Sequence, residues 1–240
     1  MNDVVVKTTP FGQVSMRNPE AMAERMTQSA QEGALGSAPD GSEFLNFSGK
    51  RGVYEFGKDK ENLDSRERWV INIASFEDGF IAWKGGRPLA TRLANIYTGV
   101  PIQEPDPGEL GPFNENDGEG WFRAKSMVLR SMDEEDKQGY LKINSKSGVA
   151  AIADLQAEVS ARMKAGLDPW PVVTLGVEKF TAQGKTNFKP KFAIEGWVSE
   201  AALVAFAENP DMEVEDLFDM EVDDEPEEEP APKRRSRRKL

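Results

Sequence analysis

Residues 171–199, PVVTLGVEKFTAQGKTNFKPKFAIEGWVS, decide the fold that the sequence predicts. Two runs of alternating apolar and polar residues, 172–177 and 191–198, flank a polar turn at residues 182–187. Alternation with Val, Ile, Phe and Trp is typical of strands with one buried face, and the turn has the Gly and Asn that a hairpin needs. The sequence therefore predicts an antiparallel hairpin. Its lysines are Lys179, Lys185, Lys189 and Lys191.

The acidity of the chain is concentrated near its end. The 240 residues carry a formal net charge of -12, and residues 211–229 contain twelve acids and no base. Those twelve acids equal the whole deficit, so the rest of the chain is neutral. The body is therefore free to carry basic surfaces that attract polyanions.

Cysteine and histidine are both absent from the sequence. Their absence excludes disulfides, thiolate chemistry and any catalytic triad that needs histidine. No phosphate-binding loop motif occurs, and the carboxylates fall in loops rather than in buried pairs. We therefore expect a protein that is not an enzyme and that uses no metal or cofactor.

The start of the chain, MNDVVVKTTP, lacks the basic and apolar regions of a secretory signal. No apolar run approaches the roughly 20 residues that a membrane helix needs. We expect a soluble protein in the cytoplasm, which would be that of the bacterial host if the gene belongs to a phage.

Three segments are predicted from composition. Residues 1–43 form an N-terminal arm, in which Asn18 caps a short helix and a Gly- and Ser-rich linker follows. Residues 44–208 form the folded domain. Residues 209–240 form a disordered acidic tail that ends in a run of six bases.

The regular elements predicted in the domain come from hydrophobic periodicity and from Gly, Pro and Ser at their ends. Residues 69–84 are either one long strand that bends at a bulge on Gly79 or a tight hairpin there. The segment 85–120 holds seven glycines and five prolines and is predicted as a long loop. The other elements are a hairpin at 44–56, strands at 121–130 and 140–144, a helix opening at 147–148, the hairpin at 172–198, and a short helix capped by Ser199.

The order of these elements predicts a mainly β fold with minor α content. A long strand, two more strands, a helix and a final hairpin match the five-stranded barrel of the OB-fold, with its helix between strands three and four. In that fold, residues 85–120 and 182–187 would form the loops that border the oligonucleotide-binding face. An α+β sandwich with the same elements paired differently remains the alternative.

Aromatic and basic residues alternate on several predicted strands. Trp121, Arg123 and Lys125 project to one side of their strand, and Tyr140 and Lys142 alternate in the same way. Proteins bind single strands by stacking bases on aromatic rings and by holding phosphates in a basic groove. The predicted nucleic-acid-binding residues are Trp83, Lys84, Arg87, Arg92, Trp121, Arg123, Lys125, Tyr140, Lys142, Lys146, Lys185, Lys189 and Lys191.

Each of these residues also has an ordinary structural explanation. Aromatic residues on strands are most often part of the core, and lysines on strands are most often solvated. Lys189 and Lys191 are further expected to share a face with Trp197. We give more weight to binding because the same pattern recurs on four strands, whereas the acids gather in loops and in the tail.

Two segments resemble a known group of proteins. They are RWVINIASFEDGFIAWKGG at residues 68–86 and the stretch from PWPVVTLGVEKF to EGWVS at residues 169–199. Both resemble segments of tailed-bacteriophage early proteins, and the body with its acidic tail resembles phage single-stranded DNA-binding proteins with an OB-fold. In those proteins the acidic tail commonly ends in an aromatic residue, whereas this chain ends in a basic run.

The resemblance implies a protein that binds single-stranded DNA without sequence preference in phage replication or recombination. Replication or recombination proteins would be its further partners, recruited through the acidic tail, and a homo-oligomer is left open. The alternative is a non-enzymatic interaction module, or a DNA-mimicking inhibitor, that acts through its acidic segments. The two functions differ in which sign of charge makes the contact.

Overall fold

The computed structural model describes residues 38–39, 41–99, 102–134, 136–182, 184–209 and 212–218. The predicted N-terminal helix after Asn18 and the end of the acidic tail with its basic run lie outside these residues. Within the described part of the chain, no helix is both long and apolar enough to cross a membrane.

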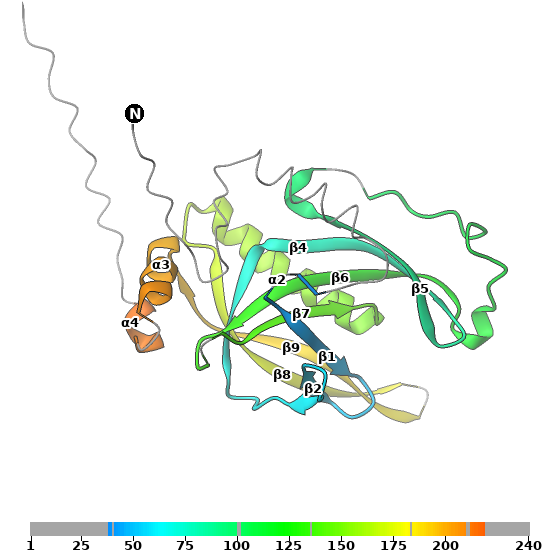
Figure 1. The fold of residues 1–240 in the computed structure, drawn as a ribbon, viewed down its shortest axis with the longest axis horizontal. Coiled ribbons are helices and arrows are strands. Elements are labelled where there is room, and N and C mark those ends of the chain that lie inside the picture. The colour runs from blue at the N-terminus through cyan, green and yellow to red at the C-terminus, as the bar shows by residue number, and fades with distance from the viewer. Residues whose placement is uncertain are drawn as a thin grey trace, which may run out of the picture.

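The described residues form one curled, open sheet of nine strands, so the predicted mainly β fold is confirmed. The sheet order is β3-β2-β1-β7-β6-β4-β8-β9, and β5 pairs with β4 outside this path (Figure 1). The strands are β1 (Glu43–Ser48), β2 (Val53–Phe56), β3 (Glu61–Asn62), β4 (Arg68–Lys84), β5 (Arg87–Asn95), β6 (Gly120–Ser131), β7 (Gln138–Ile143), β8 (Trp170–Ala182) and β9 (Lys185–Val198).

Three α-helices and two short 3-10 helices complete the described structure. Helices α3 (Glu200–Glu208) and α4 (Val214–Phe218) lie together at one end of the molecule, opposite the tips of the β4–β5 and β8–β9 hairpins (Figure 1). The third helix is α2 (Lys146–Lys164), and the 3-10 helices are η1 (Ile96–Thr98) and η2 (Glu115–Asp117).

The five-stranded barrel that the sequence predicted is wrong. Four strands, β1, β2, β3 and β5, join the five of the expected barrel in one sheet. The predicted hairpin at 44–56 is confirmed as β1–β2, but it is part of this sheet. β1 pairs in parallel with β7, and the N–H of Phe188 in β9 donates to the carbonyl of Gly49 at 2.9 Å. The β1–β2 hairpin therefore stands between β7 and β9, where a five-stranded barrel would close directly.

A large bulge divides β4 into two halves. β6 lines one edge of β4 throughout, but four residues of β4, 73–76, lie opposite one residue of β6. On the other edge, the first half pairs with β8 and the second half with β5. The predicted long bent strand is thus confirmed, but its bulge lies before Gly79.

Side chains satisfy the backbone groups that the bulge frees from the sheet. The Asn72 Oδ1 accepts from the N–H of Ala74 at 3.1 Å, and the Ser75 hydroxyl donates to the Asn72 carbonyl at 2.6 Å. The Ser75 Oγ also accepts from the N–H of Val128, and the Asn95 amide donates to the Ala74 carbonyl at 2.6 Å. Buried backbone groups need such partners, so these polar residues make the bulge stable.

β5 lies inside the segment that was predicted to be a long loop. It follows the turn Gly85–Gly86, in which both glycines have positive φ, and pairs with β4. Gly79 permits this pairing, because a Cβ there would lie 1.9 Å from the carbonyl oxygen of Arg92. Pro88 and the surrounding glycines concealed the strand, and the pairing shifts register near that proline, between Ala82 and Trp83 of β4.

The predicted helix after β7 is confirmed, although it begins earlier than expected. Ser145 caps it by accepting from the N–H of Gly148 at 3.2 Å. Ile152, Leu155 and Val159, spaced at three and four residues, are buried against the sheet. α2 therefore fills the inner side of the curled sheet beside β6 and β9.

The folded body extends past residue 208, where the tail was predicted to begin. The predicted cap Ser199 accepts from the N–H of Ala202 at 3.0 Å and starts α3. Beyond it, Leu217 of α4 is buried, and the ring of Phe218 lies where a Cβ on Gly196 would be. Residues 212–218 are thus packed on β9. The prediction that the tail is disordered from residue 209 is therefore wrong for these residues.

Leu217→Ala tests whether α4 belongs to the folded body. Leu217 is 1% exposed, so the change should lower the free energy of unfolding by about 2–5 kcal/mol. The control Leu167→Ala, at a residue 51% exposed, should lower it by less than about 1 kcal/mol. Urea unfolding monitored by tryptophan fluorescence measures both, and equal effects would contradict the packing of α4.

Candidate nucleic-acid interface

The predicted binding residues of β6 and β7 lie on two opposite faces of the sheet. Trp121, Arg123 and Lys125 share one face of β6, as their alternation predicted. Tyr140 and Lys142 of β7 stand opposite the even-numbered residues of β6 and so lie on the other face. One strand of nucleic acid cannot contact both sets across the sheet.

On the Trp121 face, guanidinium groups already cover the aromatic rings. The Cζ of Arg92 lies 5.2 Å from the Trp121 ring, and that of Arg123 lies 4.9 Å from the Phe80 ring. Arg92 also forms an ion pair with Glu109. Trp121 is half-buried, so it is not the open stacking platform that the sequence suggested.

Lys125 connects the sheet to α2 rather than facing solvent. Its Nζ donates to the Oε1 of Gln156 at 2.8 Å and lies 3.5 Å from Asp78. Only 12% of its side chain is exposed. The predicted phosphate contact at this residue is therefore replaced by a structural one.

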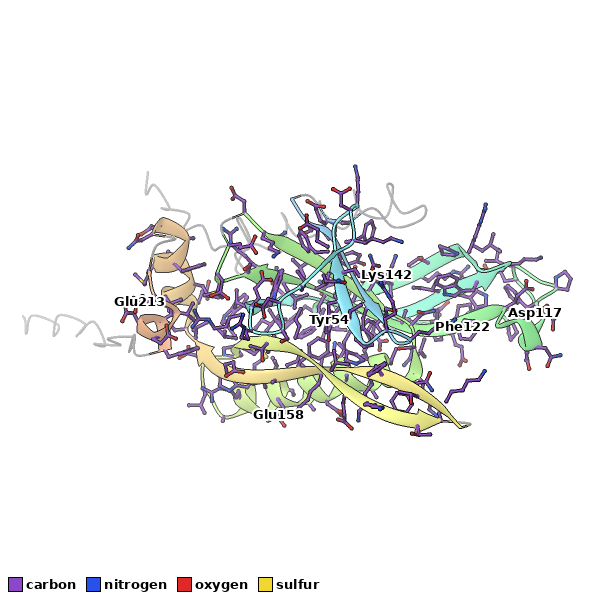
Figure 2. The ribbon with its side chains drawn as sticks, turned by 90° about the horizontal axis from the view of Figure 1, so that it is seen from below. Tyr54, Asp117, Phe122, Lys142, Glu158 and Glu213 are labelled. Carbon is purple, nitrogen blue, oxygen red and sulfur yellow. The ribbon has the colours of Figure 1, made fainter. Side chains whose placement is uncertain are left out.

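Lys84 and Arg87 are exposed at the tip of the β4–β5 hairpin, and Trp83 beside them is half-buried. One acid of the segment 102–119 contacts this tip: the Oε1 of Glu119 accepts from the N–H of Gly85 at 2.9 Å. Asp117 of the same segment lies at the far end of the molecule, well away from the labelled Lys142 (Figure 2). The Glu119 carboxylate therefore lies beside the exposed cations of the tip.

On the other face, Tyr140 and Lys142 belong to a partly buried polar cluster. Glu77 accepts hydrogen bonds from the hydroxyls of Ser126 and Tyr140, the latter at 3.0 Å. Burial raises the pKa of Tyr140 above its ordinary value, and the charge of Glu77 adds to this effect. Burial lowers the pKa of Lys142, whereas the charge of Glu77 acts in the opposite direction. Tyr140 is 6% exposed and therefore cannot stack on a base.

A second bulge, at Glu195 in β9, reverses the alternation beyond it. Trp197 consequently lies on the face opposite Lys189 and Lys191. The prediction that these three residues share one face is therefore wrong. The Trp197 ring packs under the Arg162 guanidinium of α2 at 4.6 Å. Lys191 is exposed, and Lys189 pairs with Glu178 at 3.0 Å.

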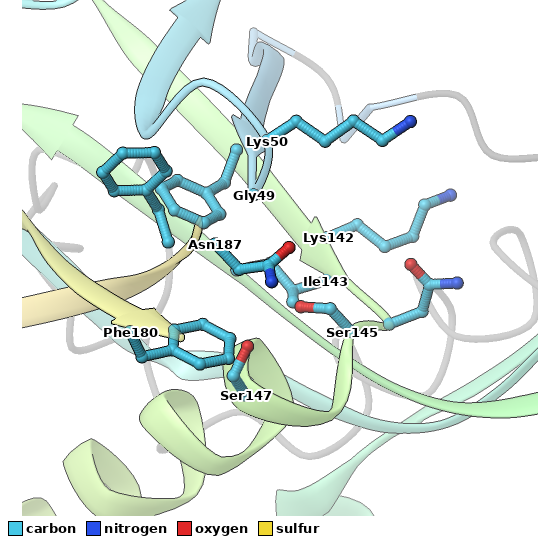
Figure 3. A pocket seen from close by; sticks show the side chains of 11 residues that line it. Gly49, Lys50, Lys142, Ile143, Ser145, Ser147, Phe180 and Asn187 are labelled. Atoms are coloured by element: carbon cyan, nitrogen blue, oxygen red, sulfur yellow. The ribbon is translucent and has the colours of Figure 1, made fainter. Parts of the chain in front are cut away.

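Three chain segments meet around a pocket of about 360 Å³, and we call this region the junction (Figure 3). They are the β1–β2 turn, the connection from β7 into α2, and the outer part of the β8–β9 hairpin. The lining residues are Phe47, Gly49, Lys50, Lys142, Ile143, Asn144, Ser145, Ser147, Phe180, Asn187 and Phe188.

The lining of the pocket contains two lysines, three phenylalanines and no carboxylate. Both lysines line the pocket, and their side chains extend in the same direction in the view of Figure 3. Two further predicted residues lie next to lining residues in the sequence: Lys146 begins α2 directly after Ser145, and Lys185 precedes Asn187 by two residues. Of the predicted residues, only Lys142 lines the pocket. Lys146 and Lys185 lie within two residues of the lining in the sequence, as does Lys189, which is paired with Glu178.

Close backbone contacts fix the walls of the pocket. The β1–β2 turn meets β9 through the hydrogen bond between Gly49 and Phe188. Gly52 has positive φ, and a Cβ there would lie 2.6 Å from the Cγ of Phe188. Sequence reasoning missed Lys50 and the phenylalanines, although glycines flank Lys50 in the turn and Lys185, Asn187 and Phe188 follow one another closely.

No known protein family matches this chain, and neither characterised proteins nor solved structures show significant similarity to it. An assignment of function therefore rests on the residues of the chain itself.

The charge of Glu77 should be measurable at Lys142. Glu77→Gln removes the charge that raises the Lys142 pKa, so burial should then lower this pKa further. NMR titration of the Lys142 side chain measures the shift. Asp154→Asn, on the exposed surface of α2, is the control and should leave the titration unchanged. A Lys142 pKa that rises in Glu77→Gln would contradict the cluster.

Proposed function

We propose that the protein binds single-stranded DNA at the junction, without strong sequence preference. One observation carries the proposal: a pocket walled by three phenylalanines and two lysines, with no carboxylate in its lining, on a chain of net charge -12. Phosphates need cations that are not already neutralised, and bases need accessible rings. Both are present at the junction.

The strand pairing supports an OB-like unit inside the larger sheet. β4 pairs with β6 on one edge and with β8 on the other, and α2 lies between β7 and the β8–β9 hairpin in the chain. This order is compatible with an OB-like unit to which β5 and the β1–β2–β3 segment would be added, although the described strands do not include the pairing of β7 with β9 that closes an OB barrel. In OB-folds the loop between the last two strands borders the oligonucleotide site, and here that loop is the tip of the β8–β9 hairpin.

The chemistry of the pocket favours single strands over duplex. Phe47, Phe180 and Phe188 line the pocket and are half-buried rather than fully buried, so a base in the pocket could contact them. A base in a duplex is stacked and paired, and its faces are not available to such rings, whereas a single strand exposes them. Stacking accepts every base, so little sequence preference follows.

Our proposal for the place of this activity in a cell rests only on the sequence resemblance to phage early proteins. We propose that the protein covers single-stranded intermediates of phage DNA replication or recombination in the bacterial cytoplasm. The acidic residues after 209 would then contact partner proteins.

Salt dependence of binding tests the proposal. The full chain should bind a fluorescent oligothymidine, and log affinity should fall linearly with log salt, with a slope of about −0.7 for each phosphate neutralised. Lys146→Ala with Lys185→Ala should reduce the magnitude of the slope by about 1.4 if each lysine contacts one phosphate. Fluorescence anisotropy at several salt concentrations measures both quantities.

The matched control is Lys58→Ala with Lys164→Ala, which removes the same charge from two exposed lysines outside the junction. Its slope should equal that of the unchanged protein. An equal reduction of the salt slope in both double variants would show that binding depends on the overall charge and not on the junction. Affinity that does not depend on salt, or tighter binding of duplex, would contradict the proposed function.

A further inference from the structure

We infer that the pocket at the junction is a subsite for a single nucleotide of the bound strand. The base of this nucleotide turns away from its stacked neighbours and enters the pocket. This inference rests on the proposed function and adds a discrete, saturable site to it. The pocket volume of about 360 Å³ lies within the range of about 300–1,000 Å³ that is usual for small-ligand sites.

The two sides of the pocket differ in chemistry. Phe180 and Ser147 lie on one side, while the side chains of Lys50 and Lys142 extend away from them on the other (Figure 3). A nucleotide has the same division between an aromatic base and an anionic phosphate. The base therefore enters beside Phe180 and the phosphate remains near the two lysines.

The polar groups of the pocket suit a base of any type. The amide nitrogen of Asn187 donates to the carbonyl of Lys185 at 3.1 Å, which leaves the amide oxygen as an acceptor. The Ser147 hydroxyl can both donate and accept. Because these groups are small and adaptable, they hold the edge of a base without selecting one.

Lys142 adds a reason for an anion to bind there. It is half-buried and its Nζ lies 5.9 Å from the Phe44 ring. Among the described residues the charge of Glu77 acts on it, but no ion pair to it is formed within 4 Å. A phosphate beside it would stabilise its charged form. Nucleotide binding should therefore raise the Lys142 pKa, an effect that a purely structural lysine would not show.

The β1–β2 hairpin makes this pocket, since it supplies Phe47, Gly49 and Lys50. These strands are additional to the OB-like unit. The hydrogen bond between Gly49 and Phe188 holds the turn against β9 and keeps the pocket wall in place.

Titration of the full chain with thymidine monophosphate tests the inference, with thymidine and inorganic phosphate as separate probes. The monophosphate should bind saturably, and each of the two fragments should bind at least tenfold more weakly. Asn187→Ala and Phe180→Leu should each weaken binding of the monophosphate at least fivefold. Lys58→Ala, which lies outside the pocket, should leave it unchanged. NMR shifts of the Lys142 side chain report the binding and its effect on the pKa.

Oligothymidine binding separates this inference from the proposed function. Asn187→Ala and Phe180→Leu should weaken it three- to tenfold without changing the salt slope, because neither change alters charge. Normal oligothymidine binding with no saturable binding of the monophosphate would overturn the subsite and leave the function intact. Monophosphate binding that both variants leave unchanged would also overturn it. If the unchanged protein did not bind oligothymidine at all, this result would instead refute the proposed function.

Discussion

The bulge in β4 is the constraint on which the rest of the structure depends. It allows one strand to pair with β8 in its first half and with β5 in its second half along the same edge. Asn72, Ser75 and Asn95 make this divergence stable by bonding the backbone groups that leave the sheet. The two hairpins that follow from it extend from the same end of the molecule (Figure 1). One of them, β8–β9, supplies a wall of the pocket.

The sequence predicted those helices and strands whose signals lie within their own residues. Alternation in residues 171–199 indicated the β8–β9 hairpin, and the spacing of Ile152, Leu155 and Val159 indicated α2. β5 was missed because its partner, the second half of β4, is fixed by a distant bulge rather than by its own residues. α4 was missed because acids surround Leu217 and Phe218, and composition gives no information about contact with Gly196.

The candidate site was harder to predict because strand pairing decides which side chains meet. Register places Lys142 on the face opposite Trp121, and a single extra residue at Glu195 moves Trp197 away from the lysines of β9. The pocket joins Gly49 and Asn187, which are distant in sequence and carry no common motif. Sequence reasoning therefore found Lys142 of the pocket lining, but neither Lys50 nor the cavity itself.

Under the proposed function, the described ion pairs would make the Trp121 face less favourable for a polyanion than the junction. On that face Arg92 pairs with Glu109, Arg123 lies 3.7 Å from Asp78, and the acidic segment 102–119 adds further negative charge nearby. An incoming phosphate would have to displace these carboxylates before it gained a cation. At the pocket, the lining offers lysines and no carboxylate. Since attraction at a protein surface depends on the net local charge, aromatic and basic residues that look equivalent in the sequence would differ in their ability to attract a polyanion.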